Sequence, residues 1–203
     1  MKKIFINKYS YYKPSAENLT ESPKLEYVDS LFKRRLSQIS KMTIEVVHNV
    51  MEENDTSKLV FTSFRGEIAR QLKINKGLVE ECDVMPASFS ISVFNTPPAV
   101  ATISLNLKSG YTAIYPSKND FASGLISATS SLFCNKDEKI IFVYADELIP
   151  REYENCAEYT NETPLAISCV FSTKKETESA KEVELNDLNN FNSPEEFLKF
   201  LTK

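Results

Sequence analysis

Apolar residues recur along this 203-residue chain in two patterns, which predict alternating strands and helices. Short runs rich in β-branched and aromatic residues are typical of buried strands, whereas a three- or four-residue spacing is typical of helices that pack one face onto a sheet. Strands are expected at residues 3–7, 58–64, 111–115, 139–145 and 164–173. Helices are expected at about residues 28–52, 65–73, 96–108, 119–133 and 193–203.

Prolines and glycines mark several of the expected boundaries. Pro97 and Pro98 fit the first turn of a helix, and Gly110 suits a left-handed stop at the end of that helix. Gly124 is expected to let the next helix approach the sheet closely. Residues 174–192 are charged and poor in apolar side chains, so a loop or weak structure is expected there.

The order of these elements predicts a three-layer α/β fold, with a mixed β-sheet, helices on both faces and an antiparallel final pair of strands. With 42% hydrophobic residues, a chain of this length can bury the core of one domain. We expect this domain to span residues 1–173. Residues 174–203 are expected to form a polar C-terminal extension with a short terminal helix.

Charge is unevenly distributed along the chain. Residues 1–76 contain 14 basic and 9 acidic side chains, whereas residues 77–203 contain 10 basic and 19 acidic ones. This asymmetry indicates either a basic face for an acidic partner or a solvated surface without one. The net charge of −4 and the lack of a recognition motif argue against nucleic acid. The apolar runs are too short for a membrane span, and the N-terminus turns polar too early for a secretory signal, so we predict a cytoplasmic protein.

Cysteine and histidine content excludes several classes of site. Cys82, Cys134, Cys156 and Cys169 form no CxxC pair and have no spacing typical of a zinc site. His48 is the only histidine, so the chain cannot assemble a site of several histidines. We therefore expect reduced thiols, and we expect neither a metal nor another cofactor.

Four segments carry a family resemblance: KRRLSQISKM at 33–42, FTSFRGE at 61–67, SFSISVFN at 88–95 and FVYADELIP at 142–150. In this order and at these spacings they resemble the β-ketoacyl synthase-like N-terminal domain. In particular, they resemble the short proteins, similar to ketosynthases and chain length factors, of aryl-polyene and polyketide gene clusters. The resemblance implies one half of a thiolase-like fold and a place in fatty-acid, polyketide or aryl-polyene biosynthesis.

The resemblance also identifies a position where chemistry would be expected. In a ketosynthase, the turn from a strand into a helix presents a cysteine that accepts the acyl chain, and two histidines from the second half assist decarboxylation. The matching turn here contains Ser117, Lys118 and Asn119 but no cysteine, and the chain has no histidine pair. Phe94 stands where related sequences often have a histidine.

The resemblance therefore implies a non-catalytic, chain-length-factor-like protein without independent activity. Such a protein would associate with a ketosynthase subunit, or with an acyl carrier protein that bears a phosphopantetheine-linked acyl chain. Either a homodimer or a heterodimer is compatible with this role. Edge strands and the helix after Gly110 are the association surfaces that the family implies.

Basic residues offer a candidate surface for docking a partner. Lys33, Arg34, Arg35 and Lys41 fall within the expected long helix, and Arg65 precedes the next helix. Because acyl carrier proteins are acidic, these side chains could steer such a partner by charge. The alternative is a solvated helix face.

Other interpretations of the sequence remain open. Ser117 could be the nucleophile of a stand-alone acyltransferase or thioester hydrolase, with Cys134 as the thiol alternative, but GxSxG is absent and His48 lies in the middle of a helix. A capping serine is the structural alternative. Asp146 and Glu147 end a strand and could act as acid and base, although neighbouring strand residues point to opposite faces, which favours structural roles. A structural binding module is a third possibility.

Overall fold

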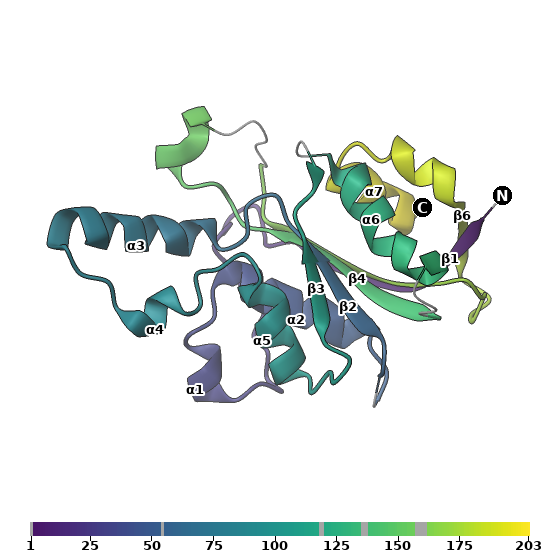
Figure 1. Cartoon of the computed structure of the whole chain (residues 1–203), viewed down its shortest axis with the longest axis horizontal. Helices are drawn as coiled ribbons and strands as arrows, with labels where there is room; N and C mark the ends of the chain where they lie inside the picture. The colour runs from purple at the N-terminus through teal and green to yellow at the C-terminus, as the bar shows by residue number, and fades with distance from the viewer. Residues whose placement is uncertain (1, 54, 118–119, 135–137, 157–161) are drawn as a thin grey trace.

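A computed structural model describes residues 2–53, 55–117, 120–134, 138–156 and 162–203 as a mixed sheet with helices on both faces (Figure 1). The strands are β1 Lys3–Tyr12, β2 Lys58–Thr62, β3 Tyr111–Ile114, β4 Lys139–Asp146, β5 Leu165–Ser172 and β6 Lys181–Glu184. The helices are α1 Ser30–Lys33, α2 Gln38–Val50, α3 Ile68–Glu81, α4 Pro86–Phe89, α5 Thr96–Ser104, α6 Phe121–Cys134 and α7 Pro194–Thr202. The 3-10 helices η2 and η3 span Arg151–Cys156 and Leu185–Asn190.

The six-stranded sheet has the order β3-β2-β4-β5-β1-β6. Strand β2 pairs in parallel with β3 and β4, whereas β5 pairs antiparallel with β4 and β1, and β6 pairs antiparallel with β1. All of β5 and all but the first residue of β4 are buried, as expected for strands covered on both faces. The predicted three-layer α/β architecture and the antiparallel pairing of its last two expected strands are confirmed.

Alternate residues of β4 face two separate apolar cores. Phe142 and Tyr144 lie in the core beneath α6 and α7, whereas Ile141 and Val143 lie in the core beneath α2 and α5. The period of two along the strand thus places helices on both sides of the sheet. Phe121, at the start of α6, meets both Phe142 and Tyr144 edge to face, with ring centroids 6.4 and 5.4 Å away.

Gly124 brings α6 close to the sheet, as predicted. A methyl group built at Gly124 would lie 3.0 Å from Thr62 Oγ1, which itself donates a hydrogen bond to the Ile114 carbonyl at 3.0 Å. Thr62 cannot rotate away without losing that hydrogen bond. Any side chain larger than that of glycine at position 124 would therefore displace Thr62.

The expected long helix over residues 28–52 is wrong, because the chain forms two helices there, α1 and α2. Ser37 adopts an extended conformation between them, with φ −70° and ψ 172°, and its hydroxyl accepts a hydrogen bond from the Ser40 N–H. Asp29 caps α1 in the same way by accepting from Leu31 and Phe32. These local side-chain bonds compete with the apolar spacing that predicted one helix.

Other boundaries also differ from the expectations. Strand β1 continues to Tyr12, α3 continues to Glu81, and α5 ends at Ser104. Gly110 does adopt a left-handed φ of 72°, but it directly precedes β3 and does not end the helix.

Residues 174–192 contain β6 and η3, so the prediction of a loop or weak structure there is wrong. Pairing of Ile4 with Val183 places Val183 in the same core as Phe197 and Leu201 of α7. Ser193 caps α7 and Pro194 begins it, as predicted. The division of the chain at residue 173 stays a prediction.

No helix in the described ranges combines the length and the apolar character needed to cross a bilayer.

We expect Gly124→Val to lower the free energy of unfolding by about 1–3 kcal/mol, because the new side chain would collide with Thr62. Chemical denaturation followed by circular dichroism measures this change. Ser127→Val, at an exposed position of α6, is the matched control and should stay within about 0.5 kcal/mol of the wild type. Equal stabilities of the two variants would contradict the close approach.

Candidate functional site

The turn between β3 and α6 contains Ser117, where the family resemblance predicted the position of the ketosynthase nucleophile. Ser117 is exposed there; its N–H donates to Ser123 Oγ at 3.0 Å, and its carbonyl accepts from the Asp120 N–H at 2.9 Å. The Asp120 carboxylate accepts from the Ala122 N–H at 3.0 Å and so caps the helix, a role that the sequence analysis offered to Ser117. Lys118 and Asn119 lie outside the described residues.

The turn carries no thiol, because residues 111–133 contain no cysteine. Cys82 follows α3, and Cys134 is the last residue of α6; both are exposed. Cys169 lies buried in β5, where burial raises the pKa of its thiol well above the ordinary value and keeps it protonated. None of these three cysteines can act as an acyl acceptor at the turn.

His48 lies far from a catalytic arrangement with Ser117. It is exposed on α2, and its ring stacks on Tyr27 with centroids 3.8 Å apart and planes 12° apart. Helix α2 covers one face of the sheet, whereas α6, which follows the Ser117 turn, covers the other. The pairing of nucleophile and base that a serine hydrolase needs is therefore not built from these two residues.

Asp146 joins the carboxyl end of β4 to the turn that follows β2. Its buried carboxylate accepts hydrogen bonds from Ser63 Oγ at 2.6 Å, from the Phe64 N–H at 2.9 Å and from the Arg65 N–H at 3.1 Å. Burial raises the pKa of Asp146 to about 6, and these bonds limit the rise. Gly66, in the same turn, has a left-handed φ of 59°.

Glu147 and Glu67 make hydrogen bonds around the N-terminus of α3, which is called its root below. The buried Glu147 carboxylate accepts from the Ala69 N–H at 3.2 Å. The fully buried Glu67 carboxylate accepts from Ser37 Oγ at 2.6 Å and from Ser40 Oγ at 2.7 Å. Burial, followed by the negative charge of Glu67, raises the pKa of Glu147 to about 7. Among the residues with described positions, no group of three or more His, Cys, Asp or Glu side chains is placed to hold a metal ion.

The candidate docking residues do not share one helix. Lys33 donates to the carbonyl oxygens of Lys24 and Leu25, so its ammonium group holds a neighbouring loop. Arg34 and Arg35 are exposed on the connection between α1 and α2. Lys41 is partly exposed within α2, and the partly buried Arg65 donates to the Phe64 carbonyl.

Arg70 is a basic residue that the sequence reasoning missed. Its Nε pairs with Glu67 at 3.1 Å, and its Nη2 donates to the Arg35 carbonyl at 2.9 Å, which brings the root of α3 against the basic connection. Arg70 and Lys73 also line a pocket of about 280 Å³ with Gln38 of α2. The three-residue spacing of Glu67 and Arg70 was the signal available in the sequence.

The family model of the N-terminal domain of β-ketoacyl synthases matches residues 10–198. The chain therefore belongs to this family. No curated protein matches the sequence.

Solved structures share the fold. A ketosynthase (ApeO) in complex with its chain length factor (ApeC) from Xenorhabdus doucetiae matches with a TM-score of 0.70 and 21% identity, over 84% of this chain and 79% of that chain. The ishigamide ketosynthase/chain length factor matches with a TM-score of 0.54 and 12% identity, over 77% and 47% of the two chains. Ketosynthase twelve of the Bacillus amyloliquefaciens bacillaene polyketide synthase matches with a TM-score of 0.53 and 12% identity, over 85% and 41%. This chain thus spans less than half of the latter two, and its fold is the predicted thiolase-like half.

We expect the free energy of unfolding to fall as the pH rises from about 4.5 to about 7, because folded Glu147 holds its proton more tightly than the unfolded chain does. Glu147→Gln should remove about 1–3 kcal/mol of this loss, so that the variant exceeds the wild type in stability at pH 8. Urea denaturation at pH 5 and pH 8 measures the difference.

In Glu147→Gln, the free energy of unfolding should still fall with rising pH, because the pKa of Asp146 is also raised. Glu53→Gln, at an exposed position, is the control and should keep the wild-type pH dependence. A pH dependence in Glu147→Gln that equals that of the wild type would refute the role of this carboxylate.

Proposed function

We propose that this protein is a non-catalytic, chain-length-factor-like subunit that pairs with a ketosynthase in fatty-acid, polyketide or aryl-polyene biosynthesis. The observation that carries this proposal is the lack of a thiol in the β3–α6 turn, which the family resemblance matches to the ketosynthase nucleophile. The protein would supply shape and contacts to a partner that performs the condensation.

The chemistry of acyl transfer supports this proposal. A condensing enzyme needs a thiolate that a helix N-terminus or a nearby cation can stabilise. A serine hydroxyl in its place needs an adjacent general base, and His48 is instead stacked on Tyr27 on the opposite face of the sheet. The exposed Ser117 hydroxyl therefore lacks the activation that a stand-alone acyltransferase or hydrolase requires of its histidine.

The edge of the sheet at β3 supports pairing with another protein. Within the part of the chain that the structure describes, strand β3 pairs with β2 alone and forms an edge of the sheet, so its outer backbone groups are available to a further strand. Tyr115, directly after β3, and Ile103, on the adjacent α5, are exposed large apolar side chains. One structurally similar chain comes from a ketosynthase in complex with its chain length factor, which favours a ketosynthase as the partner.

The exposed Arg34 and Arg35 support a second contact, with an acyl carrier protein. Arg70 contacts the same connection, because its Nη2 donates to the Arg35 carbonyl. Arginines in such a position attract an acidic surface and raise the rate of encounter. The carrier protein would then deliver its phosphopantetheine-linked chain to the partner.

To test the proposed function, the protein is co-expressed with the ketosynthases of its source organism, and the complex is incubated with an acyl-carrier-protein thioester. We expect intact-mass spectrometry to find the acyl group on the ketosynthase and none on this chain, because the turn offers no thiol. A stable adduct on this chain that disappears in Ser117→Ala would establish the acyltransferase or hydrolase alternative. Failure to form any complex would reject the pairing and favour a binding module outside the synthase.

We expect the double substitution Arg34→Glu and Arg35→Glu to weaken binding of the acyl carrier protein by about tenfold at low salt, because it replaces attraction by repulsion. Surface plasmon resonance at low and high salt measures the affinity. Lys199→Glu with Lys203→Glu makes the same change in net charge at exposed positions in and after α7 and should leave binding unchanged. Equal losses in both double variants would show that only net charge matters.

A further inference from the structure

Helices α3 and α4 form an arm, residues 68–89, that projects from the body of the protein at the left of Figure 1. Neither helix contains a buried residue. Leu78, Val79, Met85 and Phe89 are exposed on the arm. Because helices in proteins gain most of their stability by burying an apolar face, this arm lacks the covering that stabilises the other long helices.

The charges of α3 also oppose its own macrodipole. Arg70 and Lys73 lie near the positive N-terminal end, and Glu80 and Glu81 lie at the negative C-terminal end. Gly77 interrupts the middle of the helix and weakens it further. Arg70 is held within the chain by Glu67 and the Arg35 carbonyl. A partner of opposite polarity would be attracted by the other charges, Lys73 near one end and Glu80 and Glu81 at the other.

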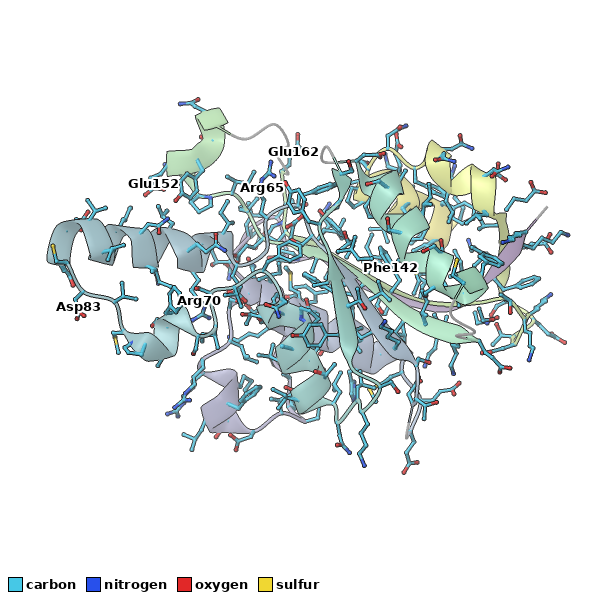
Figure 2. The ribbon with its side chains drawn as sticks, in the orientation of Figure 1. Arg65, Arg70, Asp83, Phe142, Glu152 and Glu162 are labelled. Carbon is cyan, nitrogen blue, oxygen red and sulfur yellow. The ribbon has the colours of Figure 1, made fainter. Side chains whose placement is uncertain are left out.

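A first hollow of about 310 Å³ lies between α3 and α4, with Ile74 on its wall. Arg70 and Lys73 line this hollow near the root of the arm, whereas Glu81 and Asp83 line it near the tip. Figure 2 shows Arg70 close to the body and Asp83 at the far end of the arm. One groove thus has a basic end, an apolar middle and an acidic end.

A second hollow of about 360 Å³ shares Ile74 with the first. It is lined by Phe89, Val93 and Phe94 among others. The Phe94 ring in turn packs edge to face on Tyr115, just after β3, with centroids 5.9 Å apart. The apolar surface of the arm is therefore continuous with the open edge of the sheet.

The geometry points to the arm as a docking surface for an amphipathic helix of the ketosynthase partner, an inference that rests on the proposed function. Apolar side chains of that helix fill the two hollows on either side of Ile74. Its acidic end lies over Arg70 and Lys73, and its basic end lies over Glu81 and Asp83. Acidic first turns and basic last turns are what a helix macrodipole favours, so the partner helix runs parallel to α3.

The arm is tested with the double substitution Met85→Glu and Phe89→Glu. These side chains are 68% and 58% exposed, so the free protein should fold as the wild type does. Calorimetric titration with the co-expressed ketosynthase should show affinity weakened by about tenfold or more, because charged groups would enter an apolar contact. Leu31→Glu, on α1 and 68% exposed, is the matched control and should bind normally.

Hydrogen exchange provides a second measurement on the unaltered protein. Amides of residues 68–89 should exchange more slowly in the complex than in the free chain. A complex that forms, tolerates Met85→Glu with Phe89→Glu, and leaves these amides unprotected would overturn the arm inference while the pairing stands. Absence of any complex with the wild type would instead reject the proposed function, and the arm inference with it.

Discussion

The Asp146 carboxylate holds together the part of the molecule on which the site depends. Strands β2 and β4 lie side by side in parallel, so their carboxyl ends meet, and Asp146 at the end of β4 accepts three hydrogen bonds from residues 63–65 after β2. A buried carboxylate is tolerated only when it is well solvated by donors, and the donors in turn would be costly to leave unpaired. The turn, the carboxylate and the start of α3 are therefore parts of one arrangement.

Glu67 and Glu147 extend this arrangement to a third element, α2. Through Ser37 and Ser40, the N-terminus of α2 is joined to the root of α3, and Glu147 joins the same root to the end of β4. The carboxyl edge of the sheet is where α/β enzymes often place catalytic groups. Here, Asp146, Glu147 and Glu67 make structural hydrogen bonds, which agrees with the non-catalytic role that we propose.

Features that depend on local sequence were predicted best. The apolar runs of β4 and β5 and the start of α7 at Pro194 follow from residues near one another in the chain. A glycine within an apolar helix was enough to predict the close approach at Gly124, although its neighbour Thr62 lies far away in the sequence. The break at Ser37 was missed because the apolar spacing continues across it, although Ser37 caps α2 locally and also donates to Glu67, 30 residues away. Strand β6 was missed because its four residues carry one buried side chain, and only pairing with β1 reveals it. The absence of a thiol from residues 111–133 was readable from the sequence alone, whereas the arm required the structure.

The two edges of the sheet differ in how readily each could accept another strand. At one edge, β6 is short and presents charged side chains, including Glu182, which pairs with Lys3 at 2.6 Å. Such an edge discourages the addition of another strand. At the other edge, β3 is open. In the pairing proposed above, a partner that joins at β3 would leave β6 as the outer edge on this side, and the charges of β6 would discourage a further chain from adding there.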